Sequence, residues 1–345
     1  MSELTIAFLG CGMIASAHWR GIQKHAPRLR VTAAIDRDPE RARDMADRTG
    51  GQAFTSLEDA LERGDFDAVD IMLPHDLHEA MAIRAFEAGK HVVLEKPMAP
   101  TLDACDRIME AARAAGTVFM VAEQSQFWPD AMVVQRLIEE GAIGEVIYAR
   151  MLFGGKAGSS WGGDPWRYHA DIAGGGIVID GGSHHIRPLR MWLGEIDEVV
   201  GITGRPLPAM EGESLALALF RFESGVVAAF EAWRAGAANV PGEVVRVVGY
   251  EGTIVVERKA ERVLLYDAAH REGIEVMGEM HTREDAFGLE LADFRGAVLD
   301  GAPLAAGPAE SLGELRTALA LYRSAETQRW EKVWDDSCSH GALCP

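Results

Sequence analysis

A short glycine loop near the start of the chain constrains its fold most strongly. The apolar segment Leu4–Leu9 runs directly into residues 10–15, Gly-Cys-Gly-Met-Ile-Ala, and a helical pattern follows. In this G-x-G-x-x-A pattern Gly10 permits a tight turn, Gly12 lets the backbone approach a pyrophosphate, and Ala15 lets the helix pack close to the strand. The first N–H groups of that helix are donors for phosphate oxygens. The loop therefore predicts a strand, a turn and a helix that together bind a dinucleotide.

A carboxylate after the second predicted strand supports this interpretation. Leu29–Ile35 is apolar and is followed by Asp36, at about the twenty-residue spacing where a carboxylate accepts both ribose hydroxyls. Asp36 favours NAD, because its charge would repel the 2′-phosphate of NADP. The neighbouring Arg37 is either a partner for that phosphate or a solvated residue in the turn before the next helix. NAD is therefore the first expectation for the cofactor, and NADP remains open.

The first 122 residues alternate predicted strands and helices. Strands are expected at 4–9, 29–35, 68–73, 91–95 and 118–122, and the helices between them include 39–49, 76–88 and 102–115. Strands separated by single helices predict a doubly wound parallel sheet, that is, an α/β Rossmann domain. Ligands of such folds bind at the carboxyl edge of the sheet, so we expect the cofactor there.

The pattern changes after residue 122. A helix near 128–140 is followed by strand-like segments at 145–153, 198–203, 214–222, 226–233, 244–248, 253–257 and 262–266, and helical patterns occupy 177–193, 285–299 and 308–323. Short turns between successive strands predict a large, mostly antiparallel sheet. We therefore expect an NAD(P)-binding Rossmann domain in residues 1–122. Residues 123–345 would form an α+β domain for substrate binding and oligomerisation.

Charge and cysteine content exclude several classes of partner. The chain has 34 basic and 53 acidic residues and a net charge of −19, which argues against nucleic acid and anionic membranes as partners. It shows neither a signal segment nor an apolar run of membrane-spanning length. Its four cysteines are too few and too scattered for a disulfide framework, so a cytoplasmic location is expected. Cys11 is interpreted as a small filler, and the segment with Cys338, His340 and Cys344 as a loose tail rather than a metal site.

A lysine and a proline follow the predicted strand His91–Glu95. At the carboxyl edge of a parallel sheet, the ammonium group of Lys96 can hold a substrate hydroxyl and stabilise the alkoxide that forms during oxidation. The alternative is a surface lysine beside a turn proline, Pro97.

A third chemical element follows three glycines, Gly174-Gly-Gly176. Asp180 and His184 are four residues apart in the predicted helix, so they share one face and the carboxylate can orient or balance the imidazole. His185 lies about 100° around the helix, outside that face. A core histidine bonded to a carboxylate is the alternative interpretation. The glycines favour a site, because they allow a ligand to approach the backbone closely.

An aromatic and charged stretch, residues 161–171, precedes these glycines. It contains Trp161, Trp166, Arg167 and His169. Aromatic rings stack on the apolar faces of sugars while Arg and His bind hydroxyls, which makes the stretch a candidate substrate loop. The alternative is a pair of tryptophans that anchors a long loop.

In combination these segments resemble the glucose-fructose oxidoreductase, inositol dehydrogenase and MocA-type (Gfo/Idh/MocA) family of oxidoreductases. The matching segments, in chain order, are residues 10–15, 73–78, 88–97, 144–146, 174–184 and 192–195. The resemblance implies a Rossmann domain, a second domain with an open-faced sheet, and a tightly bound nicotinamide cofactor. It also implies oxidation or reduction of a ring hydroxyl on a sugar, glycoside or cyclitol, and a homodimer or homotetramer formed through paired sheet faces.

The resemblance also suggests roles for individual residues. His184 is expected to be the general base that takes the hydroxyl proton, and Lys96 to hold the same oxygen. Asp180 is expected to orient these groups or to bind a neighbouring hydroxyl. An imidazole titrates near neutrality and can accept such a proton, so no metal is expected to be needed.

The remaining expected contacts lie in the same motifs. The cofactor-binding residues are expected to be Gly10, Gly12, Met13, Ile14, Asp36, Arg37, Leu73, Pro74, His75, His78, Glu95 and Lys96. The substrate-binding residues are expected to be Lys96, Glu123, Gln126, Trp166, Arg167, His169, Asp180, His184 and His185. Two positions depart from the family pattern, His75 where members often carry Asn and Arg187 where many carry Asp. Arg187 is interpreted as either a substrate contact or a salt-bridge partner.

Two further functions remain open from the sequence. The same family includes glycosidases that use bound NAD transiently, and the scaffold also suits a non-catalytic sensor of sugars or nucleotides. A sensor needs no base, so the set of Lys96, Asp180 and His184 argues against it.

Overall fold

The chain divides into two compact units in the computed structural model, which describes residues 3–156, 165–236, 240 and 242–334. The first unit comprises Met1–Gln124 and Glu284–Leu312, and the second comprises Ser125–Arg283 and Gly313–Pro345. Residues 284–312 were expected in the second domain because they follow it in the sequence, but they pack with the first unit.

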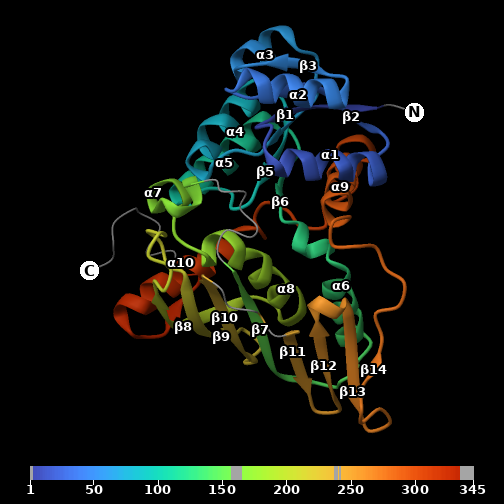
Figure 1. The fold of residues 1–345 in the computed structure, drawn as a ribbon, viewed down its shortest axis with the longest axis vertical. Coiled ribbons are helices and arrows are strands. Elements are labelled where there is room, and N and C mark those ends of the chain that lie inside the picture. The colour runs from blue at the N-terminus through green and yellow to red at the C-terminus, as the bar shows by residue number, and fades with distance from the viewer. Residues whose placement is uncertain (1–2, 157–164, 237–239, 241, 335–345) are drawn as a thin grey trace. The chain divides into compact units, whose positions relative to one another are not determined.

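The first unit contains the expected parallel sheet (Figure 1). Its strands are β1 (Leu4–Leu9), β2 (Leu29–Ile35), β3 (Gln52–Phe54), β4 (Ala68–Ile71), β5 (His91–Glu95) and β6 (Phe119–Ala122). Its helices are α1 (Met13–His25), α2 (Pro39–Thr49), α3 (Leu57–Arg63), α4 (His78–Glu87), α5 (Leu102–Ala115) and α9 (Ala286–Asp300), with the 3₁₀ turn η1 (His75–Leu77) before α4. Among the described residues the strand order is β3-β2-β1-β4-β5-β6, which confirms the doubly wound Rossmann topology. Sequence patterns did not predict β3, because it has three residues of which one is buried.

Local sequence explains where several helices of this unit begin and end. The Asp38 side chain accepts the Glu40 N–H at the start of α2, and Thr101 accepts the Ala104 N–H at the start of α5. Gly116 ends α5 with a positive φ of 66°, a conformation that costs glycine little. These caps fix the ends of helices that connect neighbouring strands.

Helix α9 joins the first unit through a close crossing with α1. A Cβ atom placed on Gly21 would lie 2.6 Å from the backbone nitrogen of Gly288, so the two backbones touch only because both residues are glycine. Charged groups flank the crossing: Lys24 Nζ lies 2.5 Å from Asp285 Oδ1, and Arg28 pairs with Asp300. This packing is the physical reason why a segment so late in the sequence belongs to the first unit.

The second unit contains a large sheet, of nine strands among the described residues, in the order β14-β13-β12-β11-β7-β10-β9-β8-β15. The strands are β7 (Val146–Lys156), β8 (Ile196–Gly204), β9 (Leu215–Phe222), β10 (Val227–Ala235), β11 (Glu243–Gly249), β12 (Gly252–Glu257), β13 (Arg262–Asp267), β14 (Ile274–Glu275) and β15 (Glu331–Lys332). Its helices are α6 (Pro129–Glu139), α7 (Ala170–Ala173), α8 (Ser183–Leu193) and α10 (Leu312–Thr327), with short turns η2 (Gln124–Phe127), η3 (Pro165–Tyr168), η4 (Val178–Gly182) and η5 (Arg258–Ala260). The β7–β10 pair is parallel and the other pairs are antiparallel, which confirms a mostly antiparallel sheet.

The segment predicted as one helix at 177–193 is divided in the structure. It begins with the π-helical turn η4, in which the Gly182 N–H donates to the Ile177 carbonyl at 2.7 Å, and continues as α8. The sequence pattern missed this division, because a π turn inserts one residue into an otherwise helical repeat. Pro188 lies inside α8.

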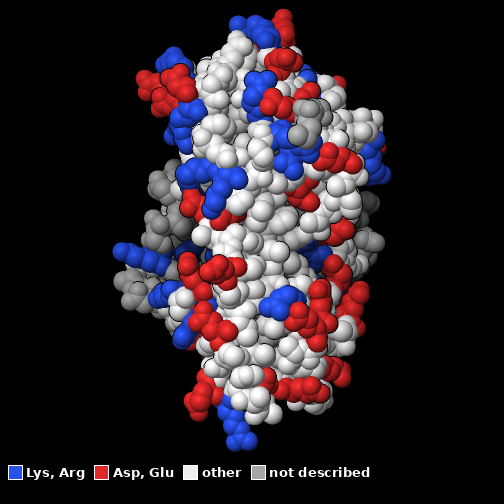
Figure 2. All heavy atoms as spheres, turned by 90° about the vertical axis from the view of Figure 1, so that its right-hand side faces the viewer, with Lys and Arg blue, Asp and Glu red and all other residues white. Residues whose placement is uncertain are grey.

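The molecular surface carries charged side chains of both signs. On the face drawn in Figure 2, acidic and basic side chains are interspersed and form no continuous basic surface. Within the described ranges, none of the helices has both the length and the apolar character that crossing a membrane requires. Cys11 and Cys105 are buried, whereas Cys338, His340 and Cys344 lie outside the described residues.

Candidate active site

The two glycines of the N-terminal loop have different surroundings. Gly10 has a φ of +97°, and a Cβ atom on it would lie within 3.0 Å of the Met72 carbonyl. Gly12 precedes α1, and no described atom lies within 4 Å of the position of a Cβ atom on it. Gly10 is therefore required by the fold, whereas Gly12 leaves space at a helix N-terminus, which suits a pyrophosphate. Of the two expected contacts that follow, Met13 is exposed and Ile14 is partly buried.

Asp36 holds the glycine loop from the end of β2. Its Oδ2 accepts the Cys11 N–H and its Oδ1 accepts the Asp38 N–H, both at 2.9 Å. These bonds fix the carboxylate at the edge where a ribose would bind, and Arg37 beside it is exposed. Burial, followed by the nearby charge of Asp36, raises the pKa of the Cys11 thiol to about 12, so the thiol stays neutral, as expected of a filler.

His78 connects the loops that follow β4 and β5. It is fully buried, with Nδ1 at 2.9 Å from the Pro97 carbonyl and Nε2 at 2.9 Å from the Leu73 carbonyl. Burial lowers the pKa of His78, so the ring is neutral and donates to one carbonyl at a time. The buried His75 ring lies 5.5 Å from it, centroid to centroid. His78 therefore lies between the Leu73 and Pro97 carbonyls and holds one of them at a time with the single N–H of its ring.

Lys96 lies at the carboxyl end of β5 and is partly exposed. The preceding Glu95 is buried: its Oε2 accepts the Lys96 N–H at 3.2 Å and its Oε1 lies 3.2 Å from His18 Nε2. Glu95 was expected to contact the cofactor, but its carboxylate faces the interior of the first unit. Glu123, an expected substrate contact, is buried at the end of β6.

Asp180 and His184 lie in consecutive turns of the second unit. Asp180 belongs to η4 and is 5% exposed, and Arg167 Nε lies 3.6 Å from its Oδ2. His184 is the second residue of α8, is partly exposed, and its ring centroid lies 5.9 Å from that of Trp128. The buried Asp180 carboxylate thus lies in the π turn, and the more accessible His184 imidazole follows it in α8.

His185 lies in the core of the second unit, in contrast to the substrate contact expected for it. Its Nδ1 lies 3.1 Å from the Gly181 carbonyl, Arg258 Nη1 lies 2.7 Å from its Nε2, and its ring stacks on Phe153 at 4.5 Å. Burial first, and then the charges of Arg258 and Arg283, lower the pKa of His185 well below its ordinary value. Both ring nitrogens of this neutral histidine are therefore engaged inside the unit.

The glycine run 174–176 has an internal structural explanation. A Cβ atom on Gly175 would lie 2.5 Å from the Tyr322 hydroxyl, and one on Gly176 would lie within 3.0 Å of the Glu213 backbone. Glu213 Oε1 accepts both the Val178 N–H and the Tyr322 hydroxyl, each at 2.9 Å. The partners that approach these glycines closely are thus Glu213 and Tyr322, which hold the start of the segment that carries Asp180. Sequence patterns did not indicate the contact of Glu213 and Tyr322 with this segment.

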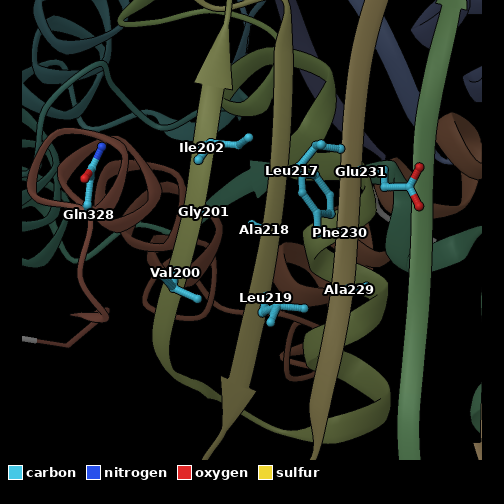
Figure 3. Close-up of a pocket in the computed structure, with 10 residues that line it drawn as sticks. All are labelled: Val200, Gly201, Ile202, Leu217, Ala218, Leu219, Ala229, Phe230, Glu231 and Gln328. Atoms are coloured by element: carbon cyan, nitrogen blue, oxygen red, sulfur yellow. The ribbon is translucent and has the colours of Figure 1, made fainter.

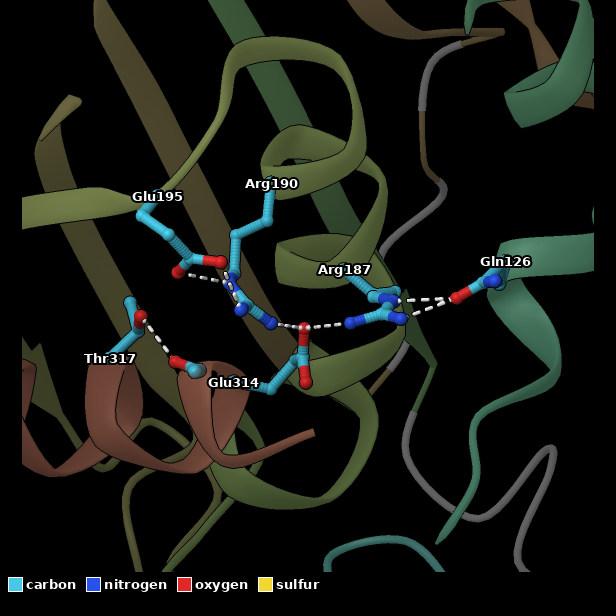
Figure 4. Close-up of polar contacts among 7 residues, drawn as sticks. Gln126, Arg187, Arg190, Glu195, Glu314 and Thr317 are labelled. Atoms are coloured by element: carbon cyan, nitrogen blue, oxygen red, sulfur yellow. Dashed lines mark hydrogen bonds and ion pairs between the residues drawn. The ribbon is translucent and has the colours of Figure 1, made fainter. Parts of the chain in front are cut away.

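Arg187 is a salt-bridge partner, one of the two interpretations from the sequence (Figure 4). It is buried, its Nη1 lies 3.5 Å from Glu314 Oε1, and its Nε donates to Gln126 Oε1 at 3.0 Å. Arg190 joins the same carboxylate and also pairs with Glu195. Because the Gln126 oxygen accepts from Arg187, only the amide NH₂ of Gln126 remains as a donor for another group.

The candidate substrate loop is described from residue 165 onward, so Trp161 lies outside the described residues. The Arg167 guanidinium lies 4.2 Å from the centre of the Trp166 ring, and Arg167 also faces Asp180. His169 is exposed and its Nδ1 lies 3.1 Å from Glu211 Oε1. With Asp171 these two residues form an exposed group whose ligand atoms lie within 4.8 Å of one another, but it carries no second sign of a metal.

Two family models match most of the chain. Residues 4–123 match the family model described as "Oxidoreductase family, NAD-binding Rossmann fold", and residues 132–255 match the "GFO/IDH/MocA C-terminal domain". Levoglucosan dehydrogenase of Pseudarthrobacter phenanthrenivorans is 28% identical over 96% of this chain and 99% of its own. The 1,5-anhydro-D-fructose reductase of Ensifer adhaerens is 30% identical over 86% of this chain and 89% of its own.

A solved structure has the same fold. The structure of levoglucosan dehydrogenase in complex with NADH and L-sorbose superposes with a TM-score of 0.85 at 25% identity, over 96% of this chain and 99% of that one. The two family models, the relatives and the fold agree along almost the whole chain. The chain therefore belongs to the Gfo/Idh/MocA family of oxidoreductases, with an NAD-binding Rossmann domain at its N-terminus.

Proposed function

We propose that this protein transfers a hydride between a ring secondary alcohol of a sugar, glycoside or cyclitol and NAD. In this proposal His184 is the general base, Lys96 holds the reacting oxygen, and Asp180 orients them or binds a neighbouring hydroxyl. The observation that carries it is the position of Lys96, at the carboxyl end of β5 in an NAD-binding unit, with the backbone on either side fixed by Glu95 and His78. A surface lysine beside a turn proline would need no such anchoring.

The first unit provides the groups that a dinucleotide needs. Gly12 leaves room for the pyrophosphate beside the N–H groups of α1, and Asp36 presents a fixed carboxylate to the ribose. The nicotinamide, when bound, supplies the hydride acceptor or donor. We propose NAD as the preferred cofactor, because the Asp36 charge would repel a 2′-phosphate.

The protein's own side chains handle the proton and the charge. During oxidation the O–H proton moves to the His184 imidazole while the carbinol carbon loses hydride, so a carbonyl remains. The Lys96 ammonium donates a hydrogen bond to the same oxygen and stabilises the negative charge that develops on it. Asp180, buried beside Arg167, is a rigid acceptor for a neighbouring hydroxyl. In reduction the same groups return the proton.

A substrate screen tests this proposal. Purified protein is offered sugars, inositols, anhydrosugars and glycosides with NAD or NADP, and formation of reduced cofactor is followed by absorbance. We expect turnover with at least one ring polyol. Cleavage of a glycoside without net cofactor reduction would indicate the glycosidase instead, and tight binding of sugars without any turnover would indicate a sensor.

Asp36→Asn is expected to weaken the preference for NAD over NADP by about tenfold or more, since it removes a charge that repels the 2′-phosphate. Asparagine retains an oxygen that can accept the Cys11 N–H but loses the acceptor for the Asp38 N–H, so thermal stability is measured alongside. Dissociation constants for NADH and NADPH, measured by fluorescence in the wild type and in the variant, provide the check. An unchanged preference in Asp36→Asn would contradict the role of this carboxylate.

We also propose that the outer face of the large sheet pairs with a second copy of the chain. On β8 and β9 the outward side chains Ile202, Leu217 and Leu219 are apolar and 59%, 40% and 42% exposed (Figure 3). The alternate residues of β9 are buried, so this sheet has one packed face and one apolar face open to solvent. Such a contiguous apolar patch is typical of an interface, and pairing with itself is the commonest arrangement.

Leu217→Glu is expected to convert the oligomer into monomers, since it places a further charge in the apolar patch. Light scattering coupled to size exclusion would show the change in mass. Tyr250→Glu is the control, because Tyr250 is 74% exposed in the turn between β11 and β12 and lies away from the patch. A wild-type protein that is already monomeric at working concentrations would refute the pairing.

A further inference from the structure

Four titratable side chains meet in the interior of the first unit. His18 of α1 lies among Asp70 of β4, Glu95 at the end of β5 and Glu290 of α9, and we refer to these four residues as the His18 cluster. Its Nδ1 is 2.7 Å from Asp70 Oδ2, and its Nε2 is 3.2 Å from Glu95 Oε1 and 3.7 Å from Glu290 Oε1. No side chain of the cluster is more than 10% exposed.

The geometry favours a protonated imidazole. Nδ1 bonds one carboxylate, and Nε2 faces two more, so a lone pair on Nε2 would point at oxygen atoms, whereas a proton there is attracted by both. Burial by itself would lower the pKa of His18, but the charges of Asp70 and Glu95 and the hydrogen bond to Asp70 raise it well above its ordinary value. His18 is therefore an imidazolium at neutral pH.

The cluster also retains a proton on a carboxyl group. With every group ionised it would hold two uncompensated negative charges in the core, and Glu123 adds further negative potential at Glu290. Burial raises the pKa of Glu290 well above its ordinary value. Neither Glu290 oxygen has a hydrogen-bond partner among the described residues. Glu290 is accordingly the group that stays neutral.

This arrangement is costly, and its location suggests what it does. Buried ionic groups usually contribute less to stability than apolar groups of the same size would, so their presence calls for another explanation. One oxygen of Glu95 faces His18, and the other accepts the backbone N–H of Lys96. The cluster thus lies directly behind the residue to which the proposed function assigns the reacting oxygen.

We propose that His18 is a positioning residue for Lys96, and that its imidazolium holds the Glu95 carboxylate against the Lys96 backbone. This inference rests on the proposed function for its catalytic consequence, but not for the charge state of the cluster. Glu290, delivered by the α1–α9 crossing, completes the cluster from a segment 272 residues further along the chain.

The pH dependence of stability follows from the direction of the shift. Because the folded-state pKa of His18 is raised, its contribution to stability is fully present below about 6.5, the pKa of an unfolded histidine. That contribution is lost as the pH rises through the folded-state pKa. Burial raises the folded-state pKa values of Glu290 and Asp70 as well. Their contributions to stability are therefore also lost as the pH rises. We therefore expect the first unit to lose stability on the alkaline side.

The first experiment measures the charge of His18 in the full-length protein. Long-range ¹H–¹⁵N correlation spectra of ¹⁵N-histidine-labelled protein are recorded with increasing pH, and the His18 signal is assigned from its loss in His18→Gln. Both ring nitrogens should remain protonated at pH values at which an ordinary histidine has already become neutral. In Asp70→Asn the titration should move to lower pH. A neutral His18 ring at pH 7 would overturn the proposal whatever the substrate of the enzyme is.

The second experiment separates positioning from stability. The six lysines are labelled as ¹³C-dimethyl groups, and the chemical shift of the Lys96 signal, identified with Lys96→Arg, is recorded without substrate or cofactor. His18→Gln should displace this signal, because Glu95 no longer holds the Lys96 backbone, and should lower kcat by about tenfold or more with little change in KM. His25→Gln is the matched control, because His25 lies on the same helix and pairs near the surface with Asp285. It should change neither quantity.

The double variant His18→Gln/Asp70→Asn distinguishes a positioning role of His18 from a purely stabilising one. It also replaces His18→Gln in these measurements if that variant fails to fold. Removing the unpaired Asp70 charge should restore the melting temperature, while the Lys96 chemical shift and kcat stay altered because Glu95 is still not held by His18. Recovery of the Lys96 chemical shift together with the melting temperature would show a purely structural cluster and overturn the proposal. If no substrate is found, the Lys96 chemical shift still decides, so failure of the proposed function is distinguishable from failure of this inference.

Discussion

Lys96→Ala is expected to lower kcat by about 10²- to 10⁴-fold while NADH affinity changes by less than about threefold, since the ammonium acts on the reacting oxygen and not on the dinucleotide. Loss of a preorganised donor at a developing negative charge costs several kcal/mol of transition-state stabilisation. Steady-state kinetics with the best substrate of the screen, together with NADH fluorescence titration, would measure both quantities.

Lys90→Ala is the matched control for this substitution. Lys90 comes just before β5, at the opposite end of the same strand, and its Nζ donates to the Phe66 carbonyl. It should lower thermal stability slightly and leave kcat unchanged. Full activity in Lys96→Ala would contradict the assignment of Lys96, and an equal loss in Lys90→Ala would show that the effect comes from strand stability.

The two adjacent histidines of α8 extend the same test. His184→Ala should lower kcat as strongly as Lys96→Ala, because without a base the hydroxyl proton has no acceptor. His185→Ala should mainly lower the melting temperature, because it removes a buried ring that stacks on Phe153 and accepts from Arg258. The reverse outcome, loss of turnover without loss of stability in His185→Ala, would exchange the roles of the two residues.

Sequence patterns predicted the regular elements of this protein because each strand and helix carries its own period. Strand β5 and helix α5 begin and end at the predicted residues, since apolar runs, an N-cap and a closing glycine are local signals. In β10 alternate residues are buried, as expected for a sheet with one packed face. The placement of α9 on α1 was not predictable in this way, because it depends on the contact between Gly21 and Gly288, which are distant in the sequence.

Sequence patterns indicated contacts of the candidate site only where a motif sets the spacing of its residues. Asp36 follows β2 and meets the glycine loop, as its spacing indicated. The buried partners of the site come from elsewhere: Glu290 reaches His18, and Glu314 reaches Arg187. One local signal for His18 was present, since it lies three residues after the buried Ala15 and therefore on the buried face of α1. A histidine on such a face requires a buried partner, although its identity cannot be read from the sequence.

Gly12→Ala is expected to separate cofactor binding from folding. No described atom lies within 4 Å of the added methyl group, so the free energy of unfolding should change by no more than about 1 kcal/mol. NADH affinity should fall by about 100-fold or more, because the methyl group would occupy the space through which the pyrophosphate approaches the backbone. Thermal unfolding without cofactor and NADH fluorescence titration measure the two effects in the same sample.

Gly10→Ala provides the contrast within the same loop. Gly10 has a φ of +97° and its Cβ atom would lie within 3.0 Å of the Met72 carbonyl, so alanine there should destabilise the first unit even without cofactor. The positive φ alone costs about 1–3 kcal/mol for a residue with a side chain, and displacement of the β4 loop adds to it. If Gly12→Ala were instead the more destabilised variant and still bound NADH normally, the space beside Gly12 would have no part in cofactor binding. Both glycines would then be required only for the conformation of the loop. The dinucleotide would have to be bound by groups other than the N-terminus of α1.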